Sequence, residues 1–370
     1  MAEVSRRRWF ALGDPQSTFD KLTAILGAHD ALDETGRLRE GVGLLSIGDH
    51  FDFGPRGGPE VGAEGLRFLR FLAAHPPDQV VMLAGNHDLS RVQELAFESD
   101  EGFGRARALA DRARALAAAG DVRGAEALEA EFHAAHPRIP TVEIAARDYS
   151  GFAVEQQRFV QSLLVSGRLH LAHVARHQGL PVLFTHAGVT TRELGLLGLP
   201  GGADAAVIAA ALEAFLAERV ARVAPSWARG EQAALDLAPL HVTGTAGREG
   251  GGLLYHRPSN RARPGADVRW ELDEQAPRRF DPRTLPLGVV QVVGHSGHRK
   301  CKKELAGWVS AAAAAVERGG IRTLRTDGDV IEYDLGVLPP RAGEATAYLI
   351  DGEVDLVPYE GYALLPFDAD

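Results

Sequence analysis

Residues 80–88 have the sequence VVMLAGNHD, in which an apolar run of strand length ends in a glycine and three polar residues. The apolar part can fill a buried strand, because strands with both faces covered read as continuous apolar runs. Asn86, His87 and Asp88 then supply an amide, an imidazole and a carboxylate at successive positions. We therefore predict a buried β-strand that delivers candidate metal ligands to its carboxyl end.

The same arrangement occurs four more times along the chain. An apolar run followed by a polar cluster is found at residues 9–16 (WFALGDPQ), 44–52 (LLSIGDHFD), 181–188 (PVLFTHAG) and 290–298 (VQVVGHSGH). In an α/β protein the carboxyl ends of buried strands line one edge of the sheet, where ligands bind. Five such strands would bring carboxylates, an amide and imidazoles together, which predicts a metal site built from loops far apart in the sequence.

The residue types indicate which ions such a site would hold. Asp, Asn and His without thiolates suit manganese, iron, zinc or magnesium, and exclude the copper(I) and iron–sulfur sites that need cysteine. Two divalent ions roughly 3.5–4 Å apart clamp the attacking and leaving oxygens of a displacement at phosphorus, and make hydroxide available near neutral pH. Phosphate ester hydrolysis is extremely slow without a catalyst, so it requires an electrostatic device of this strength.

The ordered set of motifs resembles the calcineurin-like metallophosphoesterase superfamily, whose usual blocks are D-x-H, G-D-x-x-D, G-N-H-[ED], a lone His after a strand, and a final G-H. The spacing of Asp49 and Asp52 and the block around His186 are closest to the branch that holds the phosphoprotein phosphatases and the bacterial diadenosine tetraphosphatases. A single G-N-H-D would carry little weight, but five blocks in the family's order are a strong signal. The resemblance implies an α/β fold of two packed mixed β-sheets flanked by helices.

The resemblance also implies a role for each matching residue. Asp14 corresponds to a ligand of the first metal, and Asp49 to the carboxylate that bridges both metals. Ligands of the second metal are expected at Asn86, His186 and His295.

His87 resembles the residue that stabilises the transition state or protonates the leaving group. Asp52 resembles the carboxylate that orients this histidine. The assignment is also sound physically, because a histidine poised near neutral pH needs a partner that fixes its tautomer. We therefore expect His87 and Asp52 to act together.

One departure from the family's pattern concerns the first metal site. Gln16 stands where the family usually has His, which replaces an imidazole nitrogen with an amide oxygen. We expect this change to weaken the site or to shift it towards oxygen-preferring ions such as manganese or magnesium. His298 is a candidate compensating ligand, although its spacing is Gly-His-x-x-His where the family has G-H-x-H.

A second departure concerns the phosphate-binding arginine. Phe53 stands where protein phosphatases carry an Arg, which weakens the protein-phosphatase interpretation. The Gly-rich segment before Arg257 resembles the loop that supplies such an arginine in diadenosine-tetraphosphatase-like enzymes, and Arg257 could contact phosphoryl oxygens in bidentate fashion. A surface-loop arginine is an equally open interpretation. Arg56 is a further candidate with less support.

Each motif taken singly also has a purely structural interpretation. Gly-Asp after a strand is common turn chemistry, and Asp caps helices. Gly-Asn is an ordinary hairpin signal, and His186 alone could be a hydrogen-bonded core histidine. The combination of all five motifs is hard to explain without a metal centre.

The composition is that of a globular protein. The 370 residues are 45% hydrophobic and 24% charged, enough to bury a large core. The net charge of −10 and the pI near 5.8 argue against broad nucleic-acid binding. The basic run at 299–303 is a local exception, open as an attraction for phosphorylated substrates or as a solvated helix start.

Cysteine usage and hydropathy bear on the compartment. The single cysteine, Cys301, excludes an intramolecular disulfide and allows a reducing compartment. No run reaches the roughly 18 apolar residues that a membrane helix requires. We expect a cytoplasmic protein without a membrane segment.

Motifs spread from residue 14 to residue 298 predict one domain over residues 1–370. Residues 9–90 alternate strand and helix patterns, with helical periodicity at 19–27 and 61–74. An Ala-, Arg- and Glu-rich stretch predicts a helical hairpin at 104–136, and a further helix is predicted at 151–177. Together these form a helical insertion at about 95–178, either a cap that controls substrate access or a stabilising or partner-binding hairpin.

The remaining residues predict two more helices and a β-rich end. Helical patterns cover 203–223 and 303–317, and strand patterns around Asp-Gly turns cover 322–334 and 345–359. We expect these strands to complete a second sheet as a C-terminal β-rich segment at about 320–370.

The function that the motifs imply is a binuclear metal-dependent phosphoesterase, a phosphoric ester hydrolase. It would hydrolyse a phosphate ester or anhydride by attack of a metal-bound hydroxide, with manganese preferred and iron, zinc, nickel or magnesium as alternatives. The substrate stays open among a phosphorylated small molecule, a nucleotide and a phosphoprotein, as does the oligomeric state. Two alternatives are a serine/threonine protein phosphatase and a catalytically degenerate binding module of the same fold. Gln16 and Phe53 favour the degenerate module, whereas His87 and Asp52 oppose it.

Overall fold

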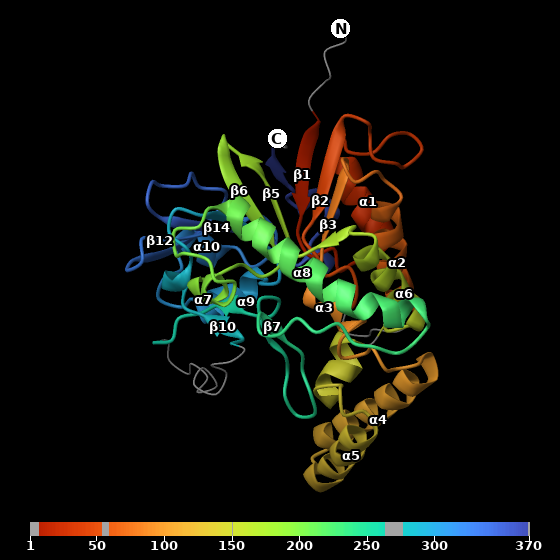
Figure 1. Cartoon of the computed structure of the whole chain (residues 1–370). Coiled ribbons are helices and arrows are strands. Elements are labelled where there is room, and N and C mark those ends of the chain that lie inside the picture. The colour runs from red at the N-terminus through yellow and green to blue at the C-terminus, as the bar shows by residue number, and fades with distance from the viewer. Residues whose placement is uncertain (1–6, 54–58, 150, 263–276, 369–370) are drawn as a thin grey trace.

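The computed structural model describes residues 7–53, 59–149, 151–262 and 277–368 (Figure 1). Two β-sheets pack face to face, and helices cover their outer sides. The predicted α/β architecture of two packed mixed sheets flanked by helices is confirmed.

The first sheet has five strands in the order β15-β1-β2-β3-β4. Strands β1 to β4 run parallel, and β15 pairs antiparallel with β1. The bounds are β1 Arg8–Leu12, β2 Val42–Ser46, β3 Val80–Leu83, β4 Leu169–His170 and β15 Leu365–Phe367. Strands β2 and β3 are buried along their whole length, which explains their continuous apolar sequences.

The second sheet has six strands in the order β13-β12-β14-β11-β6-β5. The bounds are β5 Ala172–His177, β6 Leu180–Thr185, β11 Val290–Val293, β12 Arg322–Thr326, β13 Ile331–Leu335 and β14 Ala345–Leu349. Strand β11 runs parallel to β6 and β14, and the other pairs are antiparallel. The hairpin predicted at 322–334 is confirmed as β12 and β13. The second predicted strand region is only partly right, because β14 ends at Leu349 and 3₁₀ turns follow.

Side chains from both sheets fill the space between them. Ala11 and Leu45 of the first sheet share one buried cluster with Phe184 and Val292 of the second. The ring centroid of Phe184 lies 4.9 Å from that of Phe367 on β15, so the two sheets are in direct contact. The loops after β1, β2 and β3 consequently meet the loops after β6 and β11.

Four long helices cover the outer faces. They are α1 Phe19–Ala28, α2 Pro59–Ala73, α6 Val154–Val165 and α8 Ala205–Ala228. Apolar residues of these helices pack on the outward side chains of β1 to β3 and β6 in a second buried cluster that includes Leu22, Leu69, Leu163 and Leu212. The helices predicted at 19–27, 61–74 and 203–223 are confirmed as α1, α2 and α8.

The hairpin predicted at 104–136 is confirmed as α4 Asp100–Ala118 and α5 Val122–Ala135, which project away from the sheets (Figure 1). The helix predicted at 151–177 is wrong beyond Val165. Residues 169–177 form β4 and β5, which pair with β3 and β6 in the two sheets. The stretch predicted as a helical insertion therefore also contributes one strand to each sheet.

Short elements make up the rest of the described chain. They are α3 Asn86–Ser90, the π-helix η1 Ile144–Asp148, α7 Thr191–Leu196, β7 His241–Val242, β8 Gly251–Gly252, β9 Arg257–Pro258, β10 Arg279–Phe280, η3 Pro282–Thr284, α9 His298–Glu304, α10 Ala311–Ala315, η4 Val354–Leu356 and η5 Tyr359–Gly361. The single helix predicted at 303–317 is wrong, because Gly307 adopts a φ of 98° between α9 and α10. Within the described ranges, none of the helices combines the length and apolarity needed to cross a membrane.

Candidate metal centre

The polar clusters that follow five strands meet at one edge of the two sheets. Asp14, Asp49 and Asn86 follow β1, β2 and β3, while His186 and His295 follow β6 and β11. The backbone N–H of His295 donates to Asp14 Oδ2 at 2.8 Å. His186 Nε2 lies 3.2 Å from Asn86 Oδ1, so loops from both sheets are in direct contact.

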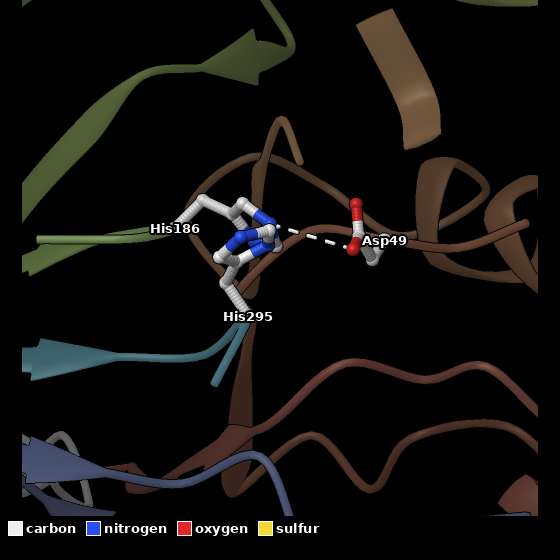
Figure 2. A group of neighbouring side chains, drawn as sticks. All are labelled: Asp49, His186 and His295. Carbon is white, nitrogen blue, oxygen red and sulfur yellow. Dashed lines mark ion pairs between the residues drawn. The ribbon is translucent and has the colours of Figure 1, made fainter. Parts of the chain in front are cut away.

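Asp49, His186 and His295 form a compact buried cluster (Figure 2). Their ligand atoms all lie within 4.8 Å of one another. His186 Nε2 is 3.4 Å from Asp49 Oδ2, and the ring centroids of the two histidines are 5.1 Å apart. Among the described residues, this is the group of three His, Cys, Asp or Glu side chains close enough to hold a metal ion.

Hydrogen bonds to the backbone fix both imidazoles. His186 Nδ1 is 3.0 Å from the Ile47 carbonyl oxygen, and His295 Nε2 is 3.0 Å from the Tyr255 carbonyl oxygen. A ring nitrogen that donates to a carbonyl leaves the other nitrogen with a lone pair for a metal. Nε2 of His186 and Nδ1 of His295 are therefore the ring nitrogens available to a metal. Burial holds the pKa of His295 well below its usual value, so this ring is neutral, as a ligand must be.

The surroundings of His186 fit a divalent ion. Its Nε2 faces two oxygens, Oδ2 of Asp49 and Oδ1 of Asn86. Burial lowers the pKa of His186, but the Asp49 carboxylate outweighs burial and raises this pKa to about 9. Two oxygens that converge on one ring nitrogen need a cation between them, either a proton or a metal. The mixed set of carboxylate, amide and imidazole ligands suits a borderline divalent ion.

Asp14 and Gln16 present oxygens beside this cluster. Within the described part of the chain, the buried Asp14 Oδ1 has no hydrogen-bond partner, which is costly unless a cation satisfies it. Gln16 Nε2 donates to the carbonyls of Phe51 at 3.0 Å and Asp52 at 2.9 Å. Both hydrogen bonds use the amide nitrogen of Gln16. Its amide oxygen is therefore available to the cavity, which Gln16 lines.

His87 lies beside the cluster with one nitrogen already engaged. Its Nδ1 lies 3.0 Å from Asp52 Oδ2, and its side chain is 16% exposed. Arg91 grips the same carboxylate, with Nη1 and Nη2 at 2.5 and 2.7 Å from its two oxygens. Asp52 thus orients His87, and Arg91 fixes Asp52. Arg91 belongs to none of the sequence motifs, and the only signal for it was its position four residues after His87.

The charges around His87 favour its protonated form. Burial lowers the pKa of His87, but the carboxylates of Asp49 and Asp52 outweigh burial and raise this pKa to about 9. Burial raises the pKa of Asp52, and Arg91 more than offsets this and keeps the pKa below its usual value. With Nδ1 bound to an ionised carboxylate, the proton on Nε2 is the one available to a substrate oxygen.

Two glycines allow the carboxylates to approach the neighbouring loops. A Cβ atom at Gly85 would lie 2.1 Å from Asp49 Oδ1, and one at Gly294 would lie 2.0 Å from Asp14 Oδ1. Both contacts are far shorter than atoms tolerate. The glycines of the G-N-H and G-H motifs are therefore required by the positions of the ligands in the partner loops.

The backbone at the centre is strained. Asp49, Asp52 and His295 have φ angles of 59°, 64° and 61°, in the left-handed region that non-glycine residues avoid. Each such residue costs on the order of 1–3 kcal/mol, and such strain is typical of functional sites. Asp88 offsets part of it, because its carboxylate accepts hydrogen bonds from the backbone of Asp49 at 2.8 Å and of His50 at 2.9 Å. The last residue of the G-N-H-D motif is thus a scaffold that ties two loops together.

A cavity of about 680 Å³ opens beside the cluster. Asp14, Gln16, Asn86 and His87 line it together with Arg257 of β9. Of the two interpretations of Arg257, the structure places it in the cavity wall rather than on an outer loop, and its buried Nε has no hydrogen-bond partner among the described residues. Arg56, the further candidate, lies outside the described residues.

Other walls of this cavity come from residues that the sequence motifs did not predict as site residues. Tyr149, Lys300 and Asp351 line it, from the segment after α5, from α9 and from the loop after β14. Lys300 belongs to the basic run at 299–303, and the neighbouring Arg257 lowers its pKa to about 8. Within the described lining, the insertion contributes Glu143, Ile144, Arg147, Asp148 and Tyr149, and no residue of α4 or α5.

The structure does not bring His298 to the centre, which corrects the prediction that it compensates for Gln16. His298 is the first residue of α9, and its Nε2 lies 3.0 Å from the Gly320 carbonyl oxygen. Its Nδ1 lies 3.4 Å from the hydroxyl of Tyr333, so both ring nitrogens are occupied elsewhere. Burial lowers the pKa of His298 to about 4, as expected of a neutral core histidine.

The fold and the site define a class of protein, an α/β protein with a buried candidate metal centre between two sheets. The sequence profile of calcineurin-like phosphoesterases matches residues 8–204, more than half of the chain. The chain belongs to the calcineurin-like phosphoesterase family. Membership supports hydrolysis of phosphoesters in general, with divalent metal ions as cofactors and a phosphorylated compound as substrate. The predicted branch within the family stays a prediction.

No curated protein matches the sequence. Similar solved structures include a cold-active protein tyrosine phosphatase of a psychrophilic Shewanella species, which is 14% identical, with 98% of this chain and 81% of that chain covered and a TM-score of 0.42. A mutant of a cold-active protein tyrosine phosphatase is 13% identical, with the same coverage and a TM-score of 0.40. Another structure of a cold-active protein tyrosine phosphatase is 16% identical over 80% of this chain and 68% of that chain, with a TM-score of 0.37.

Proposed function

We propose that this protein is a binuclear metal-dependent phosphoesterase that hydrolyses a phosphate ester or anhydride of a phosphorylated small molecule or nucleotide. The observation that carries the proposal is the buried convergence of Asp49, His186 and His295 beside His87. A structural cluster of His186 and His295 would not need a further histidine, His87, held by its own carboxylate at the wall of a cavity.

Two groups of ligands are available. Asp14 and Gln16 would hold the first ion, and Asn86, His186 and His295 the second, with Asp49 shared between them. When bound, two divalent ions supply an activated water and neutralise charge on the phosphoryl oxygens. We expect manganese in the first site, because its ligands are oxygens.

The side chains around the ligands perform the remaining steps. His87, held at Nδ1 by Asp52, donates the proton on Nε2 to the leaving oxygen. Arg257 binds the phosphoryl oxygens from the cavity wall. Its neighbour Lys300 adds a second cation, which favours a substrate with more than one negative charge near the reacting phosphorus.

The test is hydrolysis of an aryl phosphate by chelator-stripped protein, with Mn, Ni, Fe, Zn or Mg restored separately. We expect metal-dependent turnover that falls about 100-fold or more in Asp49→Asn and in His87→Ala. Asp111→Asn, which neutralises an exposed carboxylate on α4, serves as the control and should turn over like the wild type. Equal rates in the wild type and Asp49→Asn would refute the proposal.

A substrate panel separates the proposed activity from its alternatives. Nucleotides and small phosphate esters should be turned over faster than phosphopeptides, whereas a protein phosphatase would show the opposite order. A degenerate binding module would bind metal and give background rates with every substrate.

A further inference from the structure

The loop that follows β14 lies beside Asp14, a ligand of the proposed first metal site. From the sequence, this loop was predicted only as a turn. The backbone N–H of Ile350 donates to the Val293 carbonyl at 2.8 Å, so the chain continues alongside β11 towards the His295 loop. Asp351 comes next, and its Oδ1 accepts a hydrogen bond from the Glu353 N–H at 3.0 Å. Asp351 lines the same cavity as Asp14.

Close backbone contacts hold this loop against the Asp14 loop. A Cβ atom at Gly13 would lie 2.1 Å from the Ile350 carbonyl oxygen and 3.0 Å from the Asp351 nitrogen. The hydroxyl of Tyr362 lies 3.0 Å from the Gly13 carbonyl oxygen and 3.4 Å from the Ile350 carbonyl oxygen, so it joins the two loops. The residues that follow these contacts, Asp14 and Asp351, are therefore held as neighbours.

Gly297, in the last of the five motifs, leaves room for the Asp351 carboxylate. A Cβ atom at Gly297 would lie 3.3 Å from Asp351 Oδ2 and 2.9 Å from Glu353 Cγ. Glu353 itself has a φ of 56°, which adds a fourth left-handed non-glycine residue around the centre. The loop thus adopts a costly backbone conformation at the place where its carboxylates face the cavity.

Among the described residues, the two neighbouring carboxylates lack sufficient counter-charge. Asp14 is only 4% exposed, lines the cavity and has an Oδ1 without any hydrogen-bond partner. Burial and the charge of Asp351 raise the pKa of Asp14 well above its usual value. Burial also raises the pKa of Asp351; the Glu353 N–H and Lys300 offset only part of this, and Asp14 Oδ1 stays unsatisfied. A cation bound between the two carboxylates would satisfy both.

We propose that Asp351 is an additional oxygen ligand of the first divalent ion and makes up for the imidazole that Gln16 does not supply. The inference rests on the binuclear centre of the proposed function. It gives the first site the oxygens of Asp14, Gln16, Asp49 and Asp351, whereas the second site keeps two imidazoles. An all-oxygen set favours hard ions such as Mn²⁺ or Mg²⁺, while imidazoles favour ions such as Zn²⁺ or Fe²⁺. The two sites would therefore differ in metal preference.

The test measures Mn²⁺ binding to metal-stripped protein by equilibrium dialysis and elemental analysis. The wild type should bind two ions per chain, and Asp351→Asn should bind one of them about tenfold or more weakly while retaining the other. Asp355→Asn is the matched control, because it removes the same charge from the same loop and cavity wall, and it should bind like the wild type.

Three outcomes of these measurements would contradict the proposals, each in a different way. Asp351→Asn with two wild-type affinities would overturn it and show that Asp351 serves only as the partner of Lys300. A competition measurement in the wild type needs no variant: Mg²⁺ should displace one Mn²⁺ and leave the other, and equal displacement of both would overturn the all-oxygen site. A wild type that binds fewer than two ions would refute the binuclear centre itself, a failure distinct from that of Asp351.

Discussion

Arg91 is a fully buried guanidinium whose two terminal nitrogens both bind the Asp52 carboxylate. Removal of one partner from a buried ion pair costs about 3–5 kcal/mol, because the remaining charge is left uncompensated. We therefore expect Arg91→Met to lower the free energy of unfolding by an amount in that range, as measured by denaturant titration. Turnover should fall as well, since Asp52 would no longer hold His87 in one orientation.

The matched control is Arg222→Met, which breaks an exposed ion pair with Glu218 on α8. Exposed pairs contribute about 0–1 kcal/mol, so this variant should unfold nearly like the wild type. If Arg91→Met also unfolded at the wild-type denaturant concentration, Asp52 would have to be stabilised by His87 alone.

The difference between Arg91 and the candidate ligand residues shows what a sequence can reveal about a site. Asp49, Asn86 and His186 stand inside short motifs after strand-like runs, so their residue types and order were enough to predict them. Arg91 binds a carboxylate 39 positions earlier, and no local pattern marks that contact. Asp351 was missed for the same reason, because only the folded chain brings it beside Asp14.

At the scale of elements, α5 supports a wall of the cavity that it does not itself line. Its Phe132 is fully buried in a separate apolar cluster with Phe103 of α4 and with Ile144 and Tyr149. Ile144 and Tyr149 in turn line the cavity. Phe132→Ala should cost about 3–5 kcal/mol within this cluster. We expect a higher KM, a smaller change in kcat, and faster hydrogen exchange in residues 141–149.

Val122→Ala on the same helix is the control, because Val122 is 60% exposed. A surface substitution of this kind changes stability by about 0.5 kcal/mol or less. Unchanged exchange rates in residues 141–149 of Phe132→Ala would show that the hairpin and the cavity wall are independent.

Elements differed in how far the sequence predicted them. The hairpin of α4 and α5 was readable because its Ala-, Arg- and Glu-rich pattern agrees with the helix that it forms. Residues 169–177 carry Ala, His and Arg as well, and were wrongly predicted as helix. Their conformation is set by pairing with β3 and β6, a tertiary contact that overrides weak local preference.

At the scale of the whole molecule, the centre exists only where the two sheets meet. Asp14 and His295 are joined by a hydrogen bond across 281 positions of sequence. The order of the motifs predicted that such loops converge. It did not predict which side chains would be buried without compensation, because burial depends on how the whole chain packs around the site.

Glu94 is a side chain whose burial the sequence did not predict. Its carboxyl is buried, and its Oε1 accepts a hydrogen bond of 3.0 Å from the Gly244 N–H. Burial raises its pKa from 4.5 to about 7. The folded protein thus favours the protonated form, so the contribution of Glu94 to stability is fully present below pH 4.5 and is lost as the pH rises to about 7. At about 1.4 kcal/mol for each pH unit between the two pKa values, the loss amounts to about 3 kcal/mol.

Glu94→Gln keeps the shape and the acceptor oxygen of the side chain but cannot ionise. We expect the variant to gain stability over the wild type as the pH rises, by up to about 3 kcal/mol at pH 8, and to match it near pH 4.5. Denaturant titrations at a series of pH values measure the difference. Glu126→Gln, at an exposed position of α5, should give a curve parallel to the wild type. A parallel curve for Glu94→Gln as well would mean that Glu94 ionises in the folded protein as readily as in the unfolded chain.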